Sequence, residues 1–213
     1  MRSIVLLSLS LLLAAPGELD AQARRRTPQR KPAAPLPLKT EPAAVQCRES
    51  LGTGVRTKAS YCFVLAGMDP ADGVLVTIPA HNGPATLLFD LHNRHTYSDE
   101  VVKAGRGFAS YTAVIGVLTM KGELLGRGAV RSEFRTVNDL YERIGGGAGP
   151  SGVKAVAPIG AESVMVTIPA GVTQVSLLGE LLDAVTSIGR ESASPGRPVA
   201  IVSNVRVEYR PIK

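Results

Sequence analysis

Two histidines in a short polar stretch, His92 and His95, are the side chains of this chain best suited to bind a metal ion. Imidazole and carboxylate groups are common ligands of Zn²⁺ and similar ions, and Asp99 lies four residues beyond the second histidine. Successive side chains on a β-strand point to opposite faces, so residues 92 and 95 converge only if the chain turns at Asn93. A polar surface loop is the competing interpretation, and the sequence favours it. His92, His95 and Asp99 are therefore weak candidates for a metal site.

Other patterns that could carry chemistry are incomplete. The glycine-rich stretch at residues 145–152 lacks the Gly-Lys-Ser/Thr that a phosphate-binding loop requires, because Lys154 follows Val153. It is better explained as a flexible connection. There is no Gly-x-Ser-x-Gly nucleophile motif, and no pair of carboxylates stands out. The sequence thus predicts no catalytic residue and no cofactor, although a hydrolase without a recognisable motif remains an alternative.

Aromatic residues that could stack on sugars or bases are scarce. The chain has no Trp, and most of its Tyr and Phe residues fall in periodic positions typical of a core. Only Tyr97 and Phe108 have loop-like surroundings. Nucleic-acid binding is therefore not expected of the folded part. A small-ligand or glycan site built from hydrogen-bonding groups around residues 92–99 remains an alternative.

The N-terminus predicts export. Residues 1–23 combine Arg2, an apolar run at residues 4–15 and the small-x-small sequence Ala21-Gln22-Ala23, as in a cleavable signal peptide. The apolar run is shorter than the roughly 20 residues that a membrane-spanning helix needs. Cys47 and Cys62 are the only cysteines, and an even count in an exported chain favours a disulfide. We expect a secreted or periplasmic protein with a Cys47–Cys62 bridge.

Residues 24–43 differ in composition from the rest. Six basic residues and four prolines fall between residues 24 and 41, against the single acid Glu41. Such a segment buries too little apolar surface to offset its ordering entropy, so it is predicted to be a disordered linker. A basic tail of this kind could touch an anionic surface; a solvated spacer is the simpler interpretation. Residues 44–213 are long enough for a single domain.

Short alternating apolar segments dominate this domain. Val205, Val207 and Tyr209, for example, alternate with charged residues, as in a half-buried strand. The sequence Met120-Lys121-Gly122-Glu123 separates two apolar runs and fits a tight hairpin. Residues 132–144 instead have apolar positions three and four apart, with Ser132 as a possible N-cap. They predict one short amphipathic helix.

An internal repeat is the most informative feature. Residues 71–91 align without gaps on residues 161–181, and ten of the 21 pairs are identical. Both copies contain Val-x-Val-Thr-Ile-Pro-Ala, whereas the histidines are not kept, because Leu182 and Val185 stand at the positions of His92 and His95. We interpret the repeat as a duplication, with halves at about residues 61–131 and 153–213. Each copy would form a strand, a turn at Pro-Ala and a returning strand.

These patterns predict an all-β protein. Two related halves packed face to face would give a β-sandwich or jelly roll with pseudo-twofold symmetry and one short helix between the halves. The favoured function is an exported, non-enzymatic module that binds a protein or a cell-envelope component. Its partner could add a strand to a sheet edge such as residues 199–209.

Overall fold

The structure, a computed structural model, describes residues 36–93, 95–134, 136, 140–145, 154–158, 161–187 and 189–212. These residues belong to one compact unit of the chain, Pro35–Lys213. The predicted signal peptide and residues 24–35 of the predicted linker lie outside the described residues, as do Gly146–Val153 of the glycine-rich connection. Within the described part, no helix has the length and apolar character needed to cross a bilayer.

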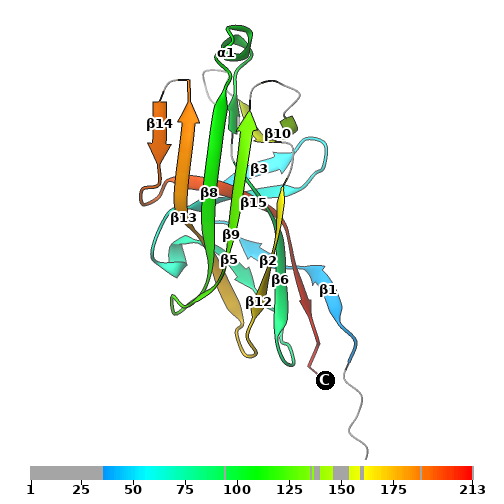
Figure 1. The fold of residues 1–213 in the computed structure, drawn as a ribbon. Helices are drawn as coiled ribbons and strands as arrows, with labels where there is room; N and C mark the ends of the chain where they lie inside the picture. Colours follow the sequence, from blue (N-terminus) through cyan, green and yellow to red (C-terminus); the bar gives the residue numbers. More distant parts are fainter. Residues whose placement is uncertain are drawn as a thin grey trace, which may run out of the picture. The chain divides into compact units, whose positions relative to one another are not determined.

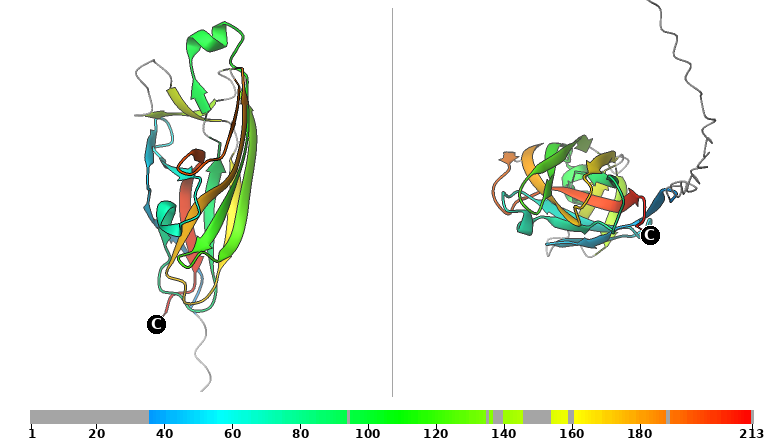
Figure 2. Two further views of the ribbon diagram at one scale, coloured as in Figure 1. Left: turned by 90° about the vertical axis from the view of Figure 1, so that its left-hand side faces the viewer. Right: turned by 90° about the horizontal axis from the view of Figure 1, so that it is seen from below.

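The domain is a β-sandwich of two antiparallel sheets, seen as two layers in Figures 1 and 2. The nine-stranded sheet runs in the order β12 (Glu162–Ile168), β6 (Ala85–His92), β15 (Pro198–Tyr209), β4 (Ser60–Leu65), β3 (Ser50–Gly54), β10 (Leu140–Gly145), β11 (Lys154–Pro158), β7 (His95–Tyr97), and β1 (Lys39–Pro42) also pairs with β15. The six-stranded sheet runs in the order β2 (Ala44–Gln46), β5 (Val74–Thr77), β13 (Gln174–Thr186), β8 (Ala109–Thr119), β9 (Leu124–Phe134), and β14 (Gly189–Ser192) pairs with β13. The predicted all-β sandwich is confirmed.

The main core fills the space between the two sheets. Alternating residues of each strand point into it, because side chains on a strand have a period of two. In β6, for example, Leu87, Phe89 and Leu91 are buried, while the residues between them are partly exposed. Burial of this apolar surface is the main force that holds the layers together.

A second, smaller core lies on the other face of the nine-stranded sheet. In β4, Cys62 and Val64 belong to the main core, whereas Tyr61 and Phe63 pack with Leu51 in the smaller one. The sheet curls around this side. Strand β7 follows β6 after two residues, although the two lie far apart in the strand order, so the sheet must bend back to bring them together.

The repeated segments do form strands, but not hairpins. Strands β5 and β6 of the first segment lie in different sheets, and so do β12 and β13 of the second. Each segment pairs instead with the other: β5 with β13 and β6 with β12, both antiparallel. The predicted pairing of strands within each half is therefore wrong. A lone hairpin is only marginally stable in water, whereas the observed pairing places every one of these strands in a sheet of six or more strands.

The two pairings are nearly equivalent. Val76 lies opposite Val175, and the corresponding Val166 lies opposite Leu87, two residues from the position that an exact symmetry would give. A shift of two keeps every side chain on its own face of the sheet. The pairing is what a duplicated unit would produce, and duplication itself stays a prediction.

The turns of the two segments meet at one end of the sandwich, at the bottom of Figure 1. Ile78 donates its backbone N–H to the carbonyl of Thr173 at 2.9 Å. His81 places its ring nitrogens 2.8 Å from the carbonyl oxygen of Pro79 and 3.4 Å from that of Pro169. The Pro-Ala sequences thus end the strands, as predicted, because proline cannot donate to a ladder.

The predicted helix at residues 132–144 is wrong. Ser132 and Phe134 belong to strand β9, and Leu140–Gly145 forms β10, which pairs with β3 and β11. The three- and four-residue spacing arose because two strands follow each other closely, and β-branched and aromatic residues there favour strands. The described helices are the 3-10 turn η1 (Pro70–Asp72) and α1 (Asp99–Lys103). The predicted hairpin at residues 120–123 is present, with Gly122 at φ +84°.

Candidate functional site

The three candidate metal ligands do not share a site. His92 and His95 are buried, whereas Asp99 begins the exposed helix α1. His92 places Nε2 3.1 Å from Ser203 Oγ, and His95 places Nε2 3.0 Å from Ser132 Oγ on another strand. Among the residues that the structure describes, no three His, Cys, Asp or Glu side chains are close enough to hold a metal ion together.

The side chain of Asn93, between the two histidines, is hydrogen-bonded to the opposite sheet. Asn93 lies between β6 and β7, and its side chain is fully buried. Its Nδ2 donates to Ser132 Oγ at 2.8 Å and lies 3.3 and 3.4 Å from the carbonyl oxygens of Tyr111 and Val130. The amide therefore connects the end of β6, in one sheet, to β8 and β9 in the other.

The Ser132–His95 contact resembles part of a nucleophile–base pair, since a histidine nitrogen lies within hydrogen-bond distance of a hydroxyl. Its surroundings are those of a core. The His95 ring packs edge-on against Tyr111, with ring centroids 4.3 Å apart, and its own exposed fraction is 0 %. Phe134 lies 5.7 Å away by the same measure. This cluster is best explained as a polar connection between the sheets, which sequence spacing alone could not distinguish from a ligand pair.

The N-terminal segment (residues 39–47) closes one side of the sandwich. Its β1 pairs with β15 of the nine-stranded sheet, and its β2 pairs with β5 of the six-stranded sheet. The prediction that residues 39–42 belong to a disordered linker is wrong, because they form a strand that pairs with β15. Lys39 lies opposite Tyr209 in this ladder, and Thr40 and Glu41 continue the register. The segment therefore crosses between the layers.

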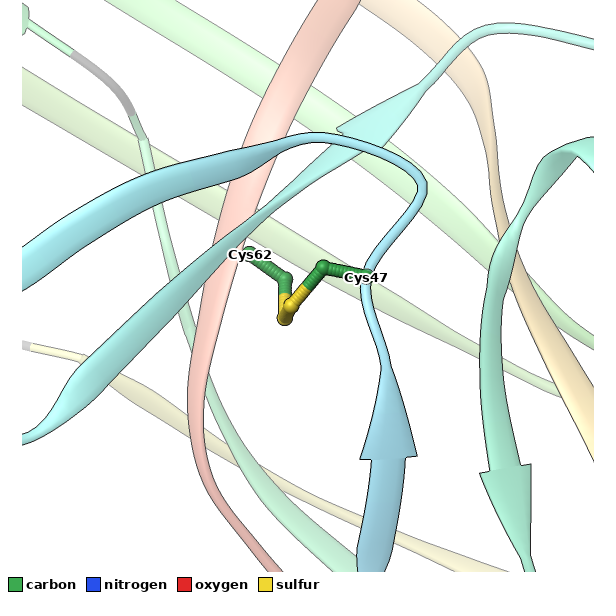
Figure 3. Close-up of a disulfide and its surroundings, with 2 residues drawn as sticks. All are labelled: Cys47 and Cys62. Carbon is green, nitrogen blue, oxygen red and sulfur yellow. A yellow bond between two sulfur atoms is a disulfide. The ribbon is translucent and has the colours of Figure 1, made fainter.

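The disulfide fixes this crossing. Cys47 follows β2, and Cys62 lies in β4 of the opposite sheet, with Cα atoms 5.4 Å apart (Figure 3). The predicted Cys47–Cys62 bridge is thus present, and both sulfurs pack against the main core. It holds β2 over the outer edge of β5.

Charges around β1 add to its attachment. Glu41 accepts a hydrogen bond from Tyr209 Oη at 2.7 Å and contacts Lys39 Nζ. The Lys39 hydrogen bond and then the Tyr209 hydrogen bond hold the pKa of the Glu41 carboxyl below its usual value. The same contact with Glu41 raises the pKa of Lys39. These groups favour the ionised carboxylate in the folded state.

Strand β15, expected to be an edge, is not one. It has β6 on one side and β4 and β1 on the other. Its charged residues therefore lie on the exposed face of a strand that has neighbours on both sides. The alternation of apolar and charged residues indicates a half-exposed strand, and it carries no information about position within the sheet.

Strand β12 is the edge of the nine-stranded sheet. Within the described residues, it pairs with β6 alone. Its counterpart in the repeat, β5, lies between β13 and β2. Residues 44–46 of β2 pair with residues 75–77 of β5, which correspond to residues 165–167 of β12. An added strand thus covers one copy of the repeated strand, whereas no described residue covers the other copy in this way.

The sequence of β12, Glu-Ser-Val-Met-Val-Thr-Ile, lacks the usual protection of an edge. Natural edges carry Lys, Pro or a bulge that prevents pairing with other chains. Here the register with β6 is continuous over seven residues, and Met165, at the centre, is 72 % exposed. On the same sheet, an open depression of about 400 Å³ is lined by Pro42, Asn204, Val205 and Arg206. Met165 is the most exposed large apolar side chain among the strand residues whose side chains the structure describes.

Strand β9, beside β12, is the edge of the other sheet. A Cβ atom at Gly128 would lie 2.8 Å from Val164 Cγ2, and one at Gly126 would lie 3.0 Å from Val166. The two glycines thus let the valines of β12 pack directly on the β9 backbone. Arg127 on β9 forms an ion pair with Glu180, 2.6 Å between Nε and Oε2. The two sheet edges on this side are held together by packing, with no strand added to either among the described residues.

Comparison with known proteins finds no family model, no curated relative and no solved structure that matches the chain. The candidate site therefore depends on the geometry of the chain itself. That geometry singles out the open edge β12 with its exposed centre at Met165.

Proposed function

We propose that this chain is an exported, non-enzymatic β-sandwich module that binds a protein partner by accepting an extended segment along β12. The observation that carries the proposal is the difference between the two repeated strands. β5 is covered by β2, whereas the equivalent strand β12 has no such cover in the described part of the chain.

The chain itself provides an example of the interaction. In β2, three residues pair antiparallel with β5 in a continuous register, Ala44 opposite Thr77 and Gln46 opposite Leu75. Strand addition of this kind takes affinity from backbone hydrogen bonds and specificity from alternate side chains. The sequence of β12 at residues 164–168 repeats that of β5 at residues 74–78 with one substitution, Met165 for Leu75. A segment similar to β2 therefore fits β12.

Export is supported by the disulfide together with the predicted signal peptide. A bridge that joins the two sheets is stable where thiols are not kept reduced. The basic residues at 24–35 would then act as a tether between the module and an anionic surface of the cell envelope. A glycan site around residues 92–99 has less support, because His92 and His95 are enclosed in the fold.

The test is an NMR titration of the isotope-labelled chain with a synthetic peptide of residues 39–48 that carries Cys47→Ser. We expect shifts centred on residues 162–168 and slower amide exchange there. The same peptide N-methylated at alternate residues is the control, because it cannot form the ladder.

Two outcomes would contradict the proposal. One is the absence of any shift in β12 at millimolar peptide, with the labelled chain at a concentration where sedimentation shows it to be monomeric. The other is an equal response to the N-methylated peptide, which would show that backbone pairing is not involved.

A further inference from the structure

We infer that the first partner of β12 is the β12 strand of a second copy of this chain, paired antiparallel about a twofold axis at Met165. This inference rests on the proposed role of β12 as a strand-accepting edge, and it identifies the occupant. The two nine-stranded sheets would then be continuous across the dimer. Three features of β12 support it: the symmetry of its sequence, the position of its charge and the contrast with the other edges.

The sequence of β12 is complementary to itself in this register. Met165 would face Met165 of the other copy, Val164 would face Val166, and Ser163 would face Thr167. Residues of one side-chain face therefore meet residues of the same face, because the pairing preserves the period of two. Hydroxyl residues pair with hydroxyl residues and β-branched with β-branched, which are favourable cross-strand combinations. The exposed Met165 side chains would cover each other.

The single charged residue of β12 lies where it does not oppose itself. Glu162 at one end would face Ile168 at the other end of the second strand. Like charges placed directly opposite destabilise a strand pair, so this position permits pairing. An arrangement in which the same patch serves both partners is the usual basis of a closed twofold dimer.

Other edges are less suited to the same interaction. β7, at the opposite end of the nine-stranded sheet, has three residues. β9 carries Arg127, Arg131 and two glycines, and its register with β8 shifts between Val117 and Leu118. β2 has three residues and is held by the disulfide, and β14 has four exposed residues with Arg190 in an ion pair with Asp183. β12 combines regular register with the absence of basic residues, proline and glycine.

A charge-swap experiment at residue 165 tests the register. Sedimentation of the purified chain should show a dimer, and Met165→Lys and Met165→Glu should each raise the dissociation constant about tenfold or more, because like charges then face each other. Mixing the two variants should restore a heterodimer, since the introduced lysine of one copy would face the introduced glutamate of the other. Met68→Lys is the matched control, because Met68 is 95 % exposed and lies outside any strand, and it should leave the dimer unchanged.

A cross-link provides a second readout that does not depend on affinity. Met165→Cys should form a disulfide-linked dimer on mild oxidation, whereas Met68→Cys should form the same dimer without the covalent link, as seen by non-reducing electrophoresis. A chain that is monomeric up to millimolar concentration, a dimer that survives Met165→Lys, or variants that do not rescue each other would overturn the inference.

These outcomes are separable from failure of the proposed function. If the chain is monomeric but the 39–48 peptide still shifts residues 162–168, the second copy is excluded and strand acceptance stands. If neither the peptide nor a second copy reaches β12, both proposals are wrong.

Discussion

The two copies of the repeated strand, β5 and β12, have nearly the same sequence but different surroundings. β5 is paired at both of its edges, with β13 and with β2, and the disulfide keeps β2 in place. β12 has β6 on one side, and its valines rest on two glycines of β9. The comparison teaches that the repeat determines the strand, whereas segments outside the repeat determine whether its edge is open.

The second strands of the two segments differ after their common part. β6 ends at His92 and is followed by the buried Asn93. β13 continues to Thr186, and Asp183, at the position that corresponds to Asn93, forms a surface ion pair with Arg190. The first copy is thus connected to both sheets by a polar network, while the second remains a simple long strand.

The largest effect should come from removing the disulfide that covers β5. The Cys47→Ser/Cys62→Ser variant should lose about 3 kcal/mol of unfolding free energy, because the bridge closes a loop of about 15 residues. Urea denaturation measures the loss. Reducing agent should lower the stability of the original chain by the same amount and leave the variant unaffected; a variant as stable as the original would show that β2 is held by pairing alone.

The packing between β9 and β12 should be the next most sensitive feature. Gly128→Ala should destabilise by about 1–3 kcal/mol, since the new methyl group would overlap the stiff side chain of Val164. Ala129→Val, on the exposed face of the same strand, is the control and should change stability by less than about 0.5 kcal/mol. Equal effects of the two substitutions would mean that the sheets do not approach closely here.

The contrast between Asn93 and Asp183 predicts unequal effects of alanine. Asn93→Ala should cost about 1–3 kcal/mol, because it removes the buried amide that donates to Ser132 Oγ and to the carbonyl oxygen of Val130. Asp183→Ala should cost clearly less, because a solvent-exposed ion pair adds little to stability. Thermal denaturation of both variants checks the difference, and similar melting temperatures would contradict the role assigned to Asn93.

The smallest effect concerns the attachment of β1. The pKa of Glu41 is lowered in the folded state by its hydrogen bonds with Lys39 and Tyr209. Its contribution to stability is therefore present above the ordinary pKa of a glutamate and is lost as the pH falls through the lowered value. The protection factors of the amides of residues 39–41 should fall as the pH is lowered over this range, and Glu41→Gln should abolish the pH dependence. Glu208→Gln, on the paired strand, is the control and should retain it.

Much of the fold could be predicted from the sequence, because strand alternation depends on local chemistry. The apolar runs at residues 74–77, 87–91, 164–168 and 205–209 all lie in strands, and the two cysteines are bridged. The prediction of a helix at residues 132–144 is wrong, because the spacing of its apolar residues extends from the end of β9 to β10, two strands that follow each other in the sequence. The sequence also could not predict which strands pair with each other, since a strand such as β15 has the same alternation of apolar and charged residues at an edge and in the middle of a sheet.

The candidate site was only partly accessible to sequence reasoning. The histidines were identified as polar residues near a turn, but their burial depends on Ser132 and Ser203, which lie about 40 and 110 residues further along the chain. The open edge at β12 could not be found from the sequence, because it is defined by strand β2, which covers β5 and has no equivalent at β12 among the residues that the structure describes. The repeat was the available signal. Residues 44–46 pair with the first copy, and among the described residues no strand pairs in the same way with the second.

The exchange of strands between the two segments has a consequence for how the chain folds. Val76 must find Val175, and Leu87 must find Val166, so neither sheet can be completed until the chain has been delivered almost to its end. A chain that emerges from a translocation channel N-terminus first would remain open along most of its length, exposed to aggregation and to chaperones. Cys47 and Cys62, by contrast, emerge close together, and their bond can form before any of the long-range pairing has begun.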